Sequence, residues 1–264
     1  MGDEFLGQIN WRQPWLAPLL PAVERVLQSA NWRDGLNAAA HDLGIKNHRS
    51  LPLRFVPQAE LTAGVAYETF ISETGGVPTR DNLHDFFNAL VWLSYPNIKV
   101  QLNDMQAREI ENRKHVPAVT RGKLRDAATI FDENAVLFLT SNPEIDRMLR
   151  QHDWRQLFVE RRTIIQQECT IHLFGHALME KLVAPYKAIT GHTWVLLAEP
   201  SILALQATEL RNWLDTTVAM QLRRGLDTSN FSHLPVLGVP GWWPMQDEHF
   251  YADTKVFRPR RQLP

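Results

Sequence analysis

From Asp81 to Tyr95 the chain reads DNLHDFFNALVWLSY, a run whose spacing predicts an amphipathic α-helix. Its apolar face carries Leu83, Phe86, Phe87, Leu90 and Leu93. The opposite face carries Asp81, His84, Asp85, Asn88, Trp92 and Tyr95. A solvated helix face is normally made of Lys, Glu, Arg and Gln. Short polar groups that bind protons or metals, with aromatic rings beside them, are more typical of the wall of a site.

The composition limits which classes of protein this chain can belong to. A hydrophobic fraction of 44% over 264 residues is enough for the core of one large domain. With 28 Lys and Arg against 29 Asp and Glu, the net charge of -1 gives no strong nucleic-acid signal and no attraction to an anionic membrane. Cys169 is the only cysteine, so no disulfide forms within the chain. With no signal peptide and no apolar run of about 18 residues, we expect a soluble cytoplasmic protein.

The remaining segments predict an α+β fold with more helix than strand. Apolar or β-branched runs predict strands at residues 53–56, 135–140, 163–172 and 193–198. Helical patterns cover residues 21–30, 32–43, 66–74, 97–112, 122–132, 174–184 and 201–224. The strands cluster in the middle, so we expect one helix-rich domain, residues 1–264, with a small central sheet.

The two ends of the chain have a different composition. Residues 1–60 are rich in Pro and Trp and predict an arm with helices packed on it. Residues 234–264 bring Pro, Gly and aromatic residues in quick succession and predict an irregular tail.

Common catalytic and nucleotide-binding motifs are absent from the sequence. Three segments remain whose side chains could form a catalytic or metal-binding site. The first is the helix at Asp81–Tyr95. The second, residues 121–134, contains Asp126, Asp132 and Glu133. The third contains His176 and Glu180, four residues apart on a helix that is otherwise almost wholly apolar. Buried His and carboxylate groups cost several kcal/mol unless each has a partner.

These segments predict a shared metal site. We expect the side chains of His84, Asp85, His176 and Glu180 to converge on a divalent ion, Zn, Mn or Fe. Asp126, Asp132 or Glu133 would act as a general base or as a further ligand. A small anionic substrate would contact Arg80, Asn88, Trp92, Lys99 and Arg125. The leading hypothesis is a metal-dependent hydrolase, with a phosphoester as one candidate substrate.

Each of these patterns also has a structural interpretation. His84 and Asp85 suit the first turn of a helix, where a negatively charged side chain interacts favourably with the positive end of the helix dipole. Asp132-Glu133-Asn134 suits a turn between a helix and a strand. His176 and Glu180 suit a buried structural pair. In this alternative the protein is a non-catalytic binding or scaffold protein whose polar residues form a buried network, so the sequence alone leaves its status as an enzyme open.

A second enzymatic alternative rests on three His-Asp dipeptides, at His41, His84 and His152. They resemble the His…His-Asp…Asp order of HD-type phosphohydrolases. That fold is all helical, whereas this chain predicts strands.

Two basic groups lie outside these segments. One surrounds Trp154, and its members are Arg147, Arg150, Arg155, Arg161 and Arg162. The other ends the chain with Arg258, Arg260 and Arg261. Phosphate binding and plain surface charge both fit such groups. No feature of the sequence predicts an oligomeric state.

Segments Pro78–Asn88, Arg125–Asn134 and Phe174–Lys181 together resemble a family of bacterial proteins catalogued only as a domain of unknown function. Two tail segments, Leu234–Trp243 and Val256–Pro259, are similar too. The resemblance covers most of the chain after Tyr67. It implies a single-domain bacterial protein, chiefly from proteobacteria, and it implies no activity.

Overall fold

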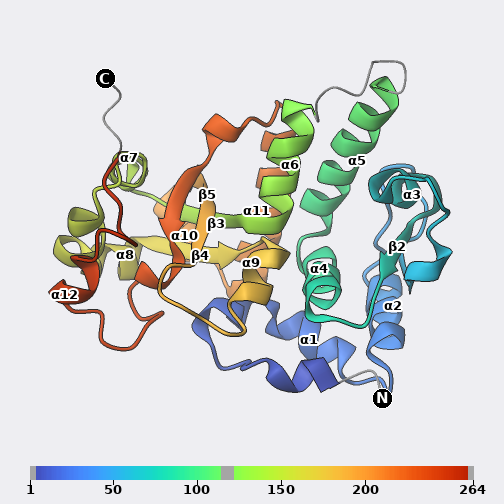
Figure 1. Ribbon diagram of the computed structural model, residues 1–264, viewed down its shortest axis with the longest axis horizontal. Coiled ribbons are helices and arrows are strands. Elements are labelled where there is room, and N and C mark those ends of the chain that lie inside the picture. Colours follow the sequence, from blue (N-terminus) through green and yellow to red (C-terminus); the bar gives the residue numbers. More distant parts are fainter. Residues whose placement is uncertain (1–3, 114–121, 261–264) are drawn as a thin grey trace.

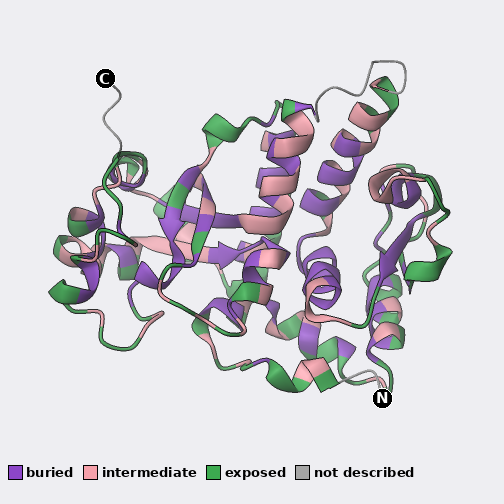
Figure 2. Cartoon of the chain, in the orientation of Figure 1, coloured by how far each residue is buried: buried purple, intermediate pink, exposed green. Residues whose placement is uncertain are grey.

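The computed structural model describes residues 4–113 and 122–260. At its centre lies helix α4 (Leu83–Ser94), preceded by its N-cap Asn82, whose side chain accepts a hydrogen bond from the Asp85 amide. Every residue from Asp85 to Ser94 is buried, so α4 is a core helix with a polar stripe (Figure 2). Pro96 begins the next helix, α5 (Pro96–Asn112), one residue before the start predicted at Asn97.

A four-stranded mixed sheet packs beside these helices in the order β4-β3-β5-β6. Its strands are β3 (Ala135–Thr140), β4 (Cys169–Leu173), β5 (Thr190–Leu197) and β6 (Ser232–Pro235). Central strand β3 is buried along its whole length, which explains its continuous apolar sequence. It runs parallel to β5 and antiparallel to β4, while β6 runs antiparallel to β5.

A second, two-stranded sheet lies at the opposite end of the molecule (Figure 1). Strands β1 (Arg54–Pro57) and β2 (Gly76–Thr79) run parallel and are joined by the crossover helix α3 (Tyr67–Thr74). Gly75 ends α3 with φ 71°, a left-handed conformation that favours glycine. The turn brings β2 directly into the loop that carries Arg80 and leads to α4.

The remaining helices complete the two ends of the fold. Helices α5 and α9 (His176–Lys181) pack against α4, α6 (Lys123–Asn134) packs against α5 and α9, and α11 (Ala207–Leu222) packs on α5. The other α-helices are α1 (Leu20–Val26), α2 (Trp32–Asp42), α7 (Pro143–Gln151), α8 (Arg162–Glu168), α10 (Pro200–Leu203) and α12 (Glu248–Tyr251). The short 3₁₀ and π turns are η1 (Glu4–Gln8), η2 (Pro14–Leu19), η3 (Gln58–Glu60), η4 (Gln156–Glu160), η5 (Thr228–Asn230) and η6 (Val236–Gly238).

The Pro- and Trp-rich segment lies along the underside of α4 (Figure 1). Phe5, Trp11 and Trp32 place their rings within 6.4 Å of the Phe86 ring. These contacts bury one apolar side of α4 beneath the arm, so the opposite, polar side of α4 faces the other helices.

The helix-rich α+β prediction is confirmed, but β2 and β6 were not predicted as strands, and three further segments differ. Residues 163–172 do not form one strand, because α8 occupies Arg162–Glu168 and β4 begins at Cys169. The helix predicted at 201–224 is divided, and Gln206 starts α11 with a capping box to Glu209. The tail contains the end of β6 and the short helix α12, and Arg261 lies outside the described residues. Among the helices that are described, none has the length and apolar composition to cross a membrane.

Candidate functional site

A cavity of about 380 Å³ opens where α3, α4, α5, α6 and α9 meet. Its polar lining residues include Tyr67, Glu68, Arg80, His84, Asp85, Asn88, Arg125, Asp132, Glu133 and His176. Helix α4 supplies residues 84, 85 and 88, and α6 supplies residues 125, 129, 132 and 133. Both sets follow the spacing of one helix face, so the pocket is built by helix periodicity. We call this cavity the helix pocket.

Two histidines from different helices meet in the helix pocket. His84 Nε2 on α4 lies 3.1 Å from His176 Nε2 on α9, and the two ring planes are 81° apart. On the far side of the first ring, His84 Nδ1 lies 2.8 Å from Glu180 Oε2. On the far side of the second, His176 Nδ1 lies 3.8 Å from Asp132 Oδ2. Each ring therefore turns one nitrogen toward a carboxylate and the other toward its neighbour.

Two neutral imidazoles can satisfy the hydrogen bonds of the histidine pair. They carry two N–H groups in total. One N–H serves His84 Nδ1 and donates to Glu180, and the other lies between the two Nε2 atoms, so His176 Nδ1 is left without a hydrogen-bond partner among the described residues. Burial lowers the pKa of His176 to about 4, against a smaller opposing effect of Asp132, so this ring is neutral at pH 7. A cation between the Nε2 atoms is the alternative arrangement, in which both Nε2 atoms act as ligands and each Nδ1 carries the N–H that faces a carboxylate.

A metal cation fits the observed spacing. Two nitrogen ligands at ~2 Å from a tetrahedral ion lie ~3.3 Å apart, close to the Nε2–Nε2 distance. A carboxylate on the second ring nitrogen is the usual partner of a metal-bound histidine. His176 Nδ1 is buried and has no hydrogen-bond partner in the described part of the chain. Residues 4–113 and 122–260 contain no group of three or more His, Cys, Asp and Glu side chains placed to hold an ion. The protein would therefore supply two ligands.

A buried chain of polar groups supports the pocket from behind. Lys99 Nζ donates to Asp132 Oδ1 at 2.6 Å and to Asn88 Oδ1 at 2.8 Å. Asn88 Nδ2 in turn lies 3.0 Å from the Tyr67 hydroxyl. Burial alone would raise the pKa of Asp132, but the Lys99 ammonium and then His176 hold it below its ordinary value. Asp132 is thus an anion beside His176, fixed in place by Lys99.

Asp85 lines the helix pocket but is held by Arg80 instead of joining the histidine pair. The Arg80 backbone amide and Nε donate to Oδ2 at 2.6 and 2.9 Å, and Nη2 donates to Oδ1 at 3.0 Å. Both carboxylate oxygens are therefore engaged. Glu180, the fourth predicted metal ligand, contacts the outer nitrogen of His84, so it orients that ring.

Three other predicted residues, Asp126, Trp92 and Lys99, lie outside the lining. Asp126 comes directly after Arg125 and is rotated ~100° from the face of α6 that lines the pocket. Trp92 follows Asn88 by one turn of α4 but is only 1% exposed, with the Lys99 ammonium 5.2 Å above its ring. Trp92 is a core residue that Lys99 covers. Lys99 is itself buried and also lies outside the lining, and it acts on the pocket through its hydrogen bonds to two lining residues, Asp132 and Asn88.

Arg125 is the cation best placed for an anionic ligand. It lines the helix pocket, and no salt bridge to it is found among the described residues. Its buried Nε atom has no hydrogen-bond partner there either. An unpaired buried N–H of a guanidinium is costly, and a bound anion would satisfy it.

Glu68 is a pocket residue that the sequence did not indicate. Its Oε2 accepts a hydrogen bond of 2.6 Å from Asn103 Nδ2. Burial raises the pKa of Glu68, and the negative charge of Asp132 raises it further. In the sequence Glu68 sits in the first turn of α3, where an acid is fully explained by the helix dipole. Only the packing of α3 against α5 and α6 distinguishes it.

The three His-Asp dipeptides do not gather in one site. Only His84-Asp85 lines the helix pocket. His41 and Asp42 have side chains 90% and 64% exposed, and His152 lines a separate cavity beside α7. This arrangement does not favour the HD-type alternative.

Comparison with known proteins places the chain in one family. A family model described as protein of unknown function (DUF3025) matches residues 53–261, which include every lining residue of the helix pocket. No curated protein and no solved structure matches the chain. The chain belongs to the DUF3025 family of proteins of unknown function.

Proposed function

We propose that this protein is a metal-dependent hydrolase that acts on a small anionic ester, with phosphoesters as the leading class. The observation that carries the proposal is the histidine pair: two Nε2 atoms 3.1 Å apart, with a carboxylate beyond each outer nitrogen. Such a pair presents two lone pairs to one point and is already oriented by its carboxylates. Zn, Mn and Fe are the ions that suit imidazole ligands.

Each pocket residue has a role in this proposal. A divalent ion between the histidines would polarise an ester oxygen as a Lewis acid. Arg125 would bind the anionic group, and Glu133 would accept a proton from the attacking water, because it lines the same wall. Glu68, whose pKa is raised by burial, would donate a proton to the leaving group. Asp132 and Glu180 would keep the imidazole rings in position.

A cytoplasmic location is part of the same proposal. The single cysteine supports it, because no disulfide can form within the chain and nothing therefore points to an oxidising compartment.

Metal content is the first test. The protein is stripped with chelator, equilibrated with Zn, Mn or Fe, and assayed by elemental analysis and calorimetry. We expect about one ion per chain, with binding lost in both His84→Ala and His176→Ala. The matched control is His41→Ala, whose side chain is 90% exposed and distant from the pocket. It should bind metal as the wild type does.

Hydrolysis is the second test. We expect metal-dependent cleavage of bis(p-nitrophenyl) phosphate or p-nitrophenyl phosphate. Glu133→Gln should abolish this activity, and Arg125→Gln should raise KM for the substrate. A wild-type protein that binds no ion at millimolar concentration would exclude the metal site and with it this function.

The second candidate is a non-catalytic protein in which the same residues form a structural network. The closed chain Asn88–Lys99–Asp132 favours it, because these groups already satisfy one another. In that case His176→Ala would lower the melting temperature, and neither metal binding nor hydrolysis would be found in the wild type.

A further inference from the structure

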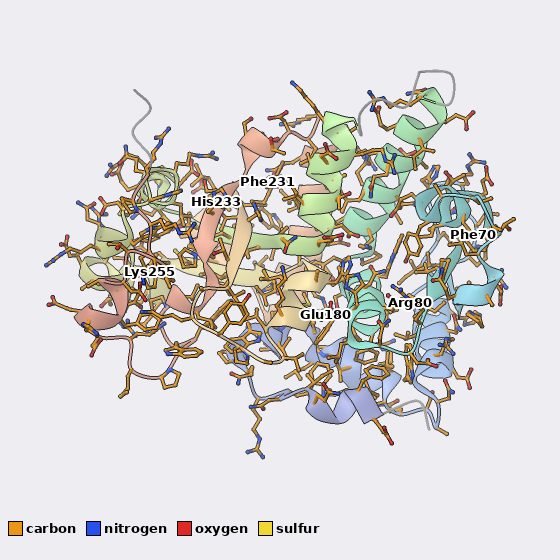
Figure 3. The ribbon with its side chains drawn as sticks, viewed as in Figure 1. Phe70, Arg80, Glu180, Phe231, His233 and Lys255 are labelled. Atoms are coloured by element: carbon orange, nitrogen blue, oxygen red, sulfur yellow. The ribbon has the colours of Figure 1, made fainter. Side chains whose placement is uncertain are left out.

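A second cavity, of about 710 Å³, lies at the other end of the central sheet. It is formed by the end of α7, by β5 and β6, and by the C-terminal segment Lys255–Arg260. Figure 3 shows His233 and Lys255 well apart from Glu180 and Arg80, so the two cavities are separate. The Trp154 indole donates to the Arg258 carbonyl at 2.8 Å, which ties the C-terminal segment to the body of the protein. We call this cavity the basic pocket.

The basic pocket has one sign of charge. Four permanent cations line it, namely Arg150, Lys255, Arg258 and Arg260. None of its described lining residues is Asp or Glu. Arg150 has a partner on its own helix, since its Nε lies 2.9 Å from Asp146 Oδ1, but Asp146 does not line the cavity. The chain as a whole has a net charge of -1, so this concentration of positive charge is local.

Three histidines form the floor between these cations. His192 and His233 face each other across β5 and β6, with ring centroids 5.0 Å apart. The ring of His152 lies 6.1 Å from that of His233 and stacks on Trp154. The Nδ1 atom of His192 is buried and has no hydrogen-bond partner in the described ranges.

The positive potential of the basic pocket comes from its four cations, which are exposed to solvent and share one cavity with no carboxylate in its described lining. Burial, followed by the neighbouring His233, lowers the pKa of both His152 and His192, the latter to about 4. The part of this lowering that comes from His233 and the absence of carboxylates from the described lining both reflect a positive electrostatic potential in the basic pocket. An anion bound there would relieve the mutual repulsion of the four cations and accept hydrogen bonds from them.

We propose that the basic pocket binds a small, multiply charged phosphate anion, such as a diphosphate group. Four cations spread around three imidazoles suit a ligand with several negative oxygens, whereas a divalent metal would be repelled. The cavity volume is within the range of small-molecule sites. The two basic groups of the sequence supply its rim, because Arg150 comes from the first and Arg258 and Arg260 from the second. The proposal is independent of the metal site in the helix pocket.

Calorimetric titration with inorganic pyrophosphate tests it. We expect one binding event that is weakened about tenfold in Arg150→Gln, since one charge-assisted hydrogen bond is lost. Arg147→Gln is the matched control: it lies on the same helix, its side chain is 44% exposed like that of Arg150, and it also pairs with an acid one turn away. Arg147 does not line the basic pocket, so its variant should bind as the wild type does.

Further arms separate the alternatives. His192→Gln combined with His233→Gln should weaken binding while the far-ultraviolet circular dichroism stays unchanged. Arg125→Gln, in the helix pocket, should leave pyrophosphate binding intact. The proposal would be overturned if Arg147→Gln and Arg150→Gln lowered the affinity for pyrophosphate equally. It would also be overturned if only Arg125→Gln lowered that affinity. Tight binding of a single-stranded oligonucleotide without binding of pyrophosphate would also overturn it, in favour of a nucleic-acid surface.

Discussion

Asp215 on α11 is a buried carboxylate that holds the start of another helix. Its Oδ2 accepts from the backbone amide and side chain of Asn97, and its Oδ1 accepts from the Ile98 amide. It therefore satisfies two of the amides that α5 leaves unpaired at its N-terminus. Burial nevertheless dominates, and it raises the pKa of Asp215 to about 6 despite these hydrogen bonds.

This pKa predicts a pH-dependent contribution to stability. Folded Asp215 binds a proton more tightly than the unfolded chain, so its contribution is largest below pH 4 and is lost as the pH rises to about 6. The difference in free energy of unfolding between the wild type and Asp215→Asn should therefore shrink from pH 4 to pH 6.5, as measured by urea denaturation. The control is Asp227→Asn, because hydrogen bonds from Ser229 lower the pKa of Asp227. Its difference from the wild type should stay level over this range, and parallel behaviour of the two variants would contradict the prediction.

Gly175 is the contact point between α9 and the end of α6. A Cβ atom at this position would lie 2.5 Å from the backbone of Glu133 and Asn134, where only movement of a helix could make room. We predict that Gly175→Ala lowers the free energy of unfolding by about 2 kcal/mol, the usual range for overpacking. It should also weaken metal binding, because it separates His176 from Asp132.

Gly7→Ala serves as the comparison, since no atom lies within 4 Å of a Cβ placed there. Metal titration and urea denaturation of both variants give the result. Unchanged metal affinity in Gly175→Ala would mean that the spacing of α6 and α9 does not set the site.

At the scale of the element, two helices have equivalent N-caps. The Asn82 side chain caps α4 by accepting from the Asp85 amide, and Asn142 caps α7 by accepting from the Glu144 amide. Replacing either residue by Ala should lower the free energy of unfolding by ~1 kcal/mol. Only Asn82→Ala should also weaken metal binding, because the first turn of α4 carries His84. Equal effects of the two variants on metal affinity would contradict this assignment.

The elements show which sequence signals decide local structure. The bounds of α4 and α5 were predictable, because an Asn cap and Pro96 mark their ends, and the apolar run of β3 identified a central strand. The strand predicted at 163–172 was too long. Its β-branched residues Thr163, Ile164 and Ile165 belong to α8, where Ile165 is buried against the core. Tertiary packing overrides a propensity worth only tenths of a kcal/mol per residue.

The candidate site was partly predictable for the same reason. His84, His176 and Glu180 could be paired from sequence because a polar residue on a buried helix must have a polar partner. The contacts of Asp85 and Glu68 could not be predicted from the sequence. Asp85 pairs with Arg80 through a loop conformation, and Glu68 arrives from a crossover helix, so both depend on long-range packing. The three histidines of the basic pocket are far apart in sequence, and they meet because the sheet register pairs His192 with His233 and the end of α7 brings His152 beside them.

On the scale of the whole molecule, buried histidines predict sensitivity to acid. Burial lowers the pKa of both His172 and His176 to about 4, from an ordinary value of 6.5. Between these values the unfolded chain binds more protons, so stability is full above pH 6.5 and falls as the pH drops toward 4. The loss for His172 is about 2 kcal/mol at pH 5.

Urea denaturation of the wild type and His172→Asn from pH 7.5 to 4.5 measures this effect. His172 Nδ1 lies 2.9 Å from the Tyr95 hydroxyl, and Asn keeps a polar group there without a titration in this range. The variant should be less stable at pH 7.5 and should lose less stability on acidification. Identical slopes in the two proteins would rule out His172 as a source of the acid sensitivity.

Proline stands at the free margins of both small sheets. Strand β6 is the outermost strand of its sheet and ends at Pro235, while the two-stranded sheet contains Pro57 and Pro78. Proline has no N–H to donate to an added strand, and η2 of the N-terminal arm packs on β4 at the opposite margin. The strands are therefore protected against edge-to-edge aggregation. Pro235→Thr would restore one donor on β6 and would open a route to fibrillar association through the strand that carries His233.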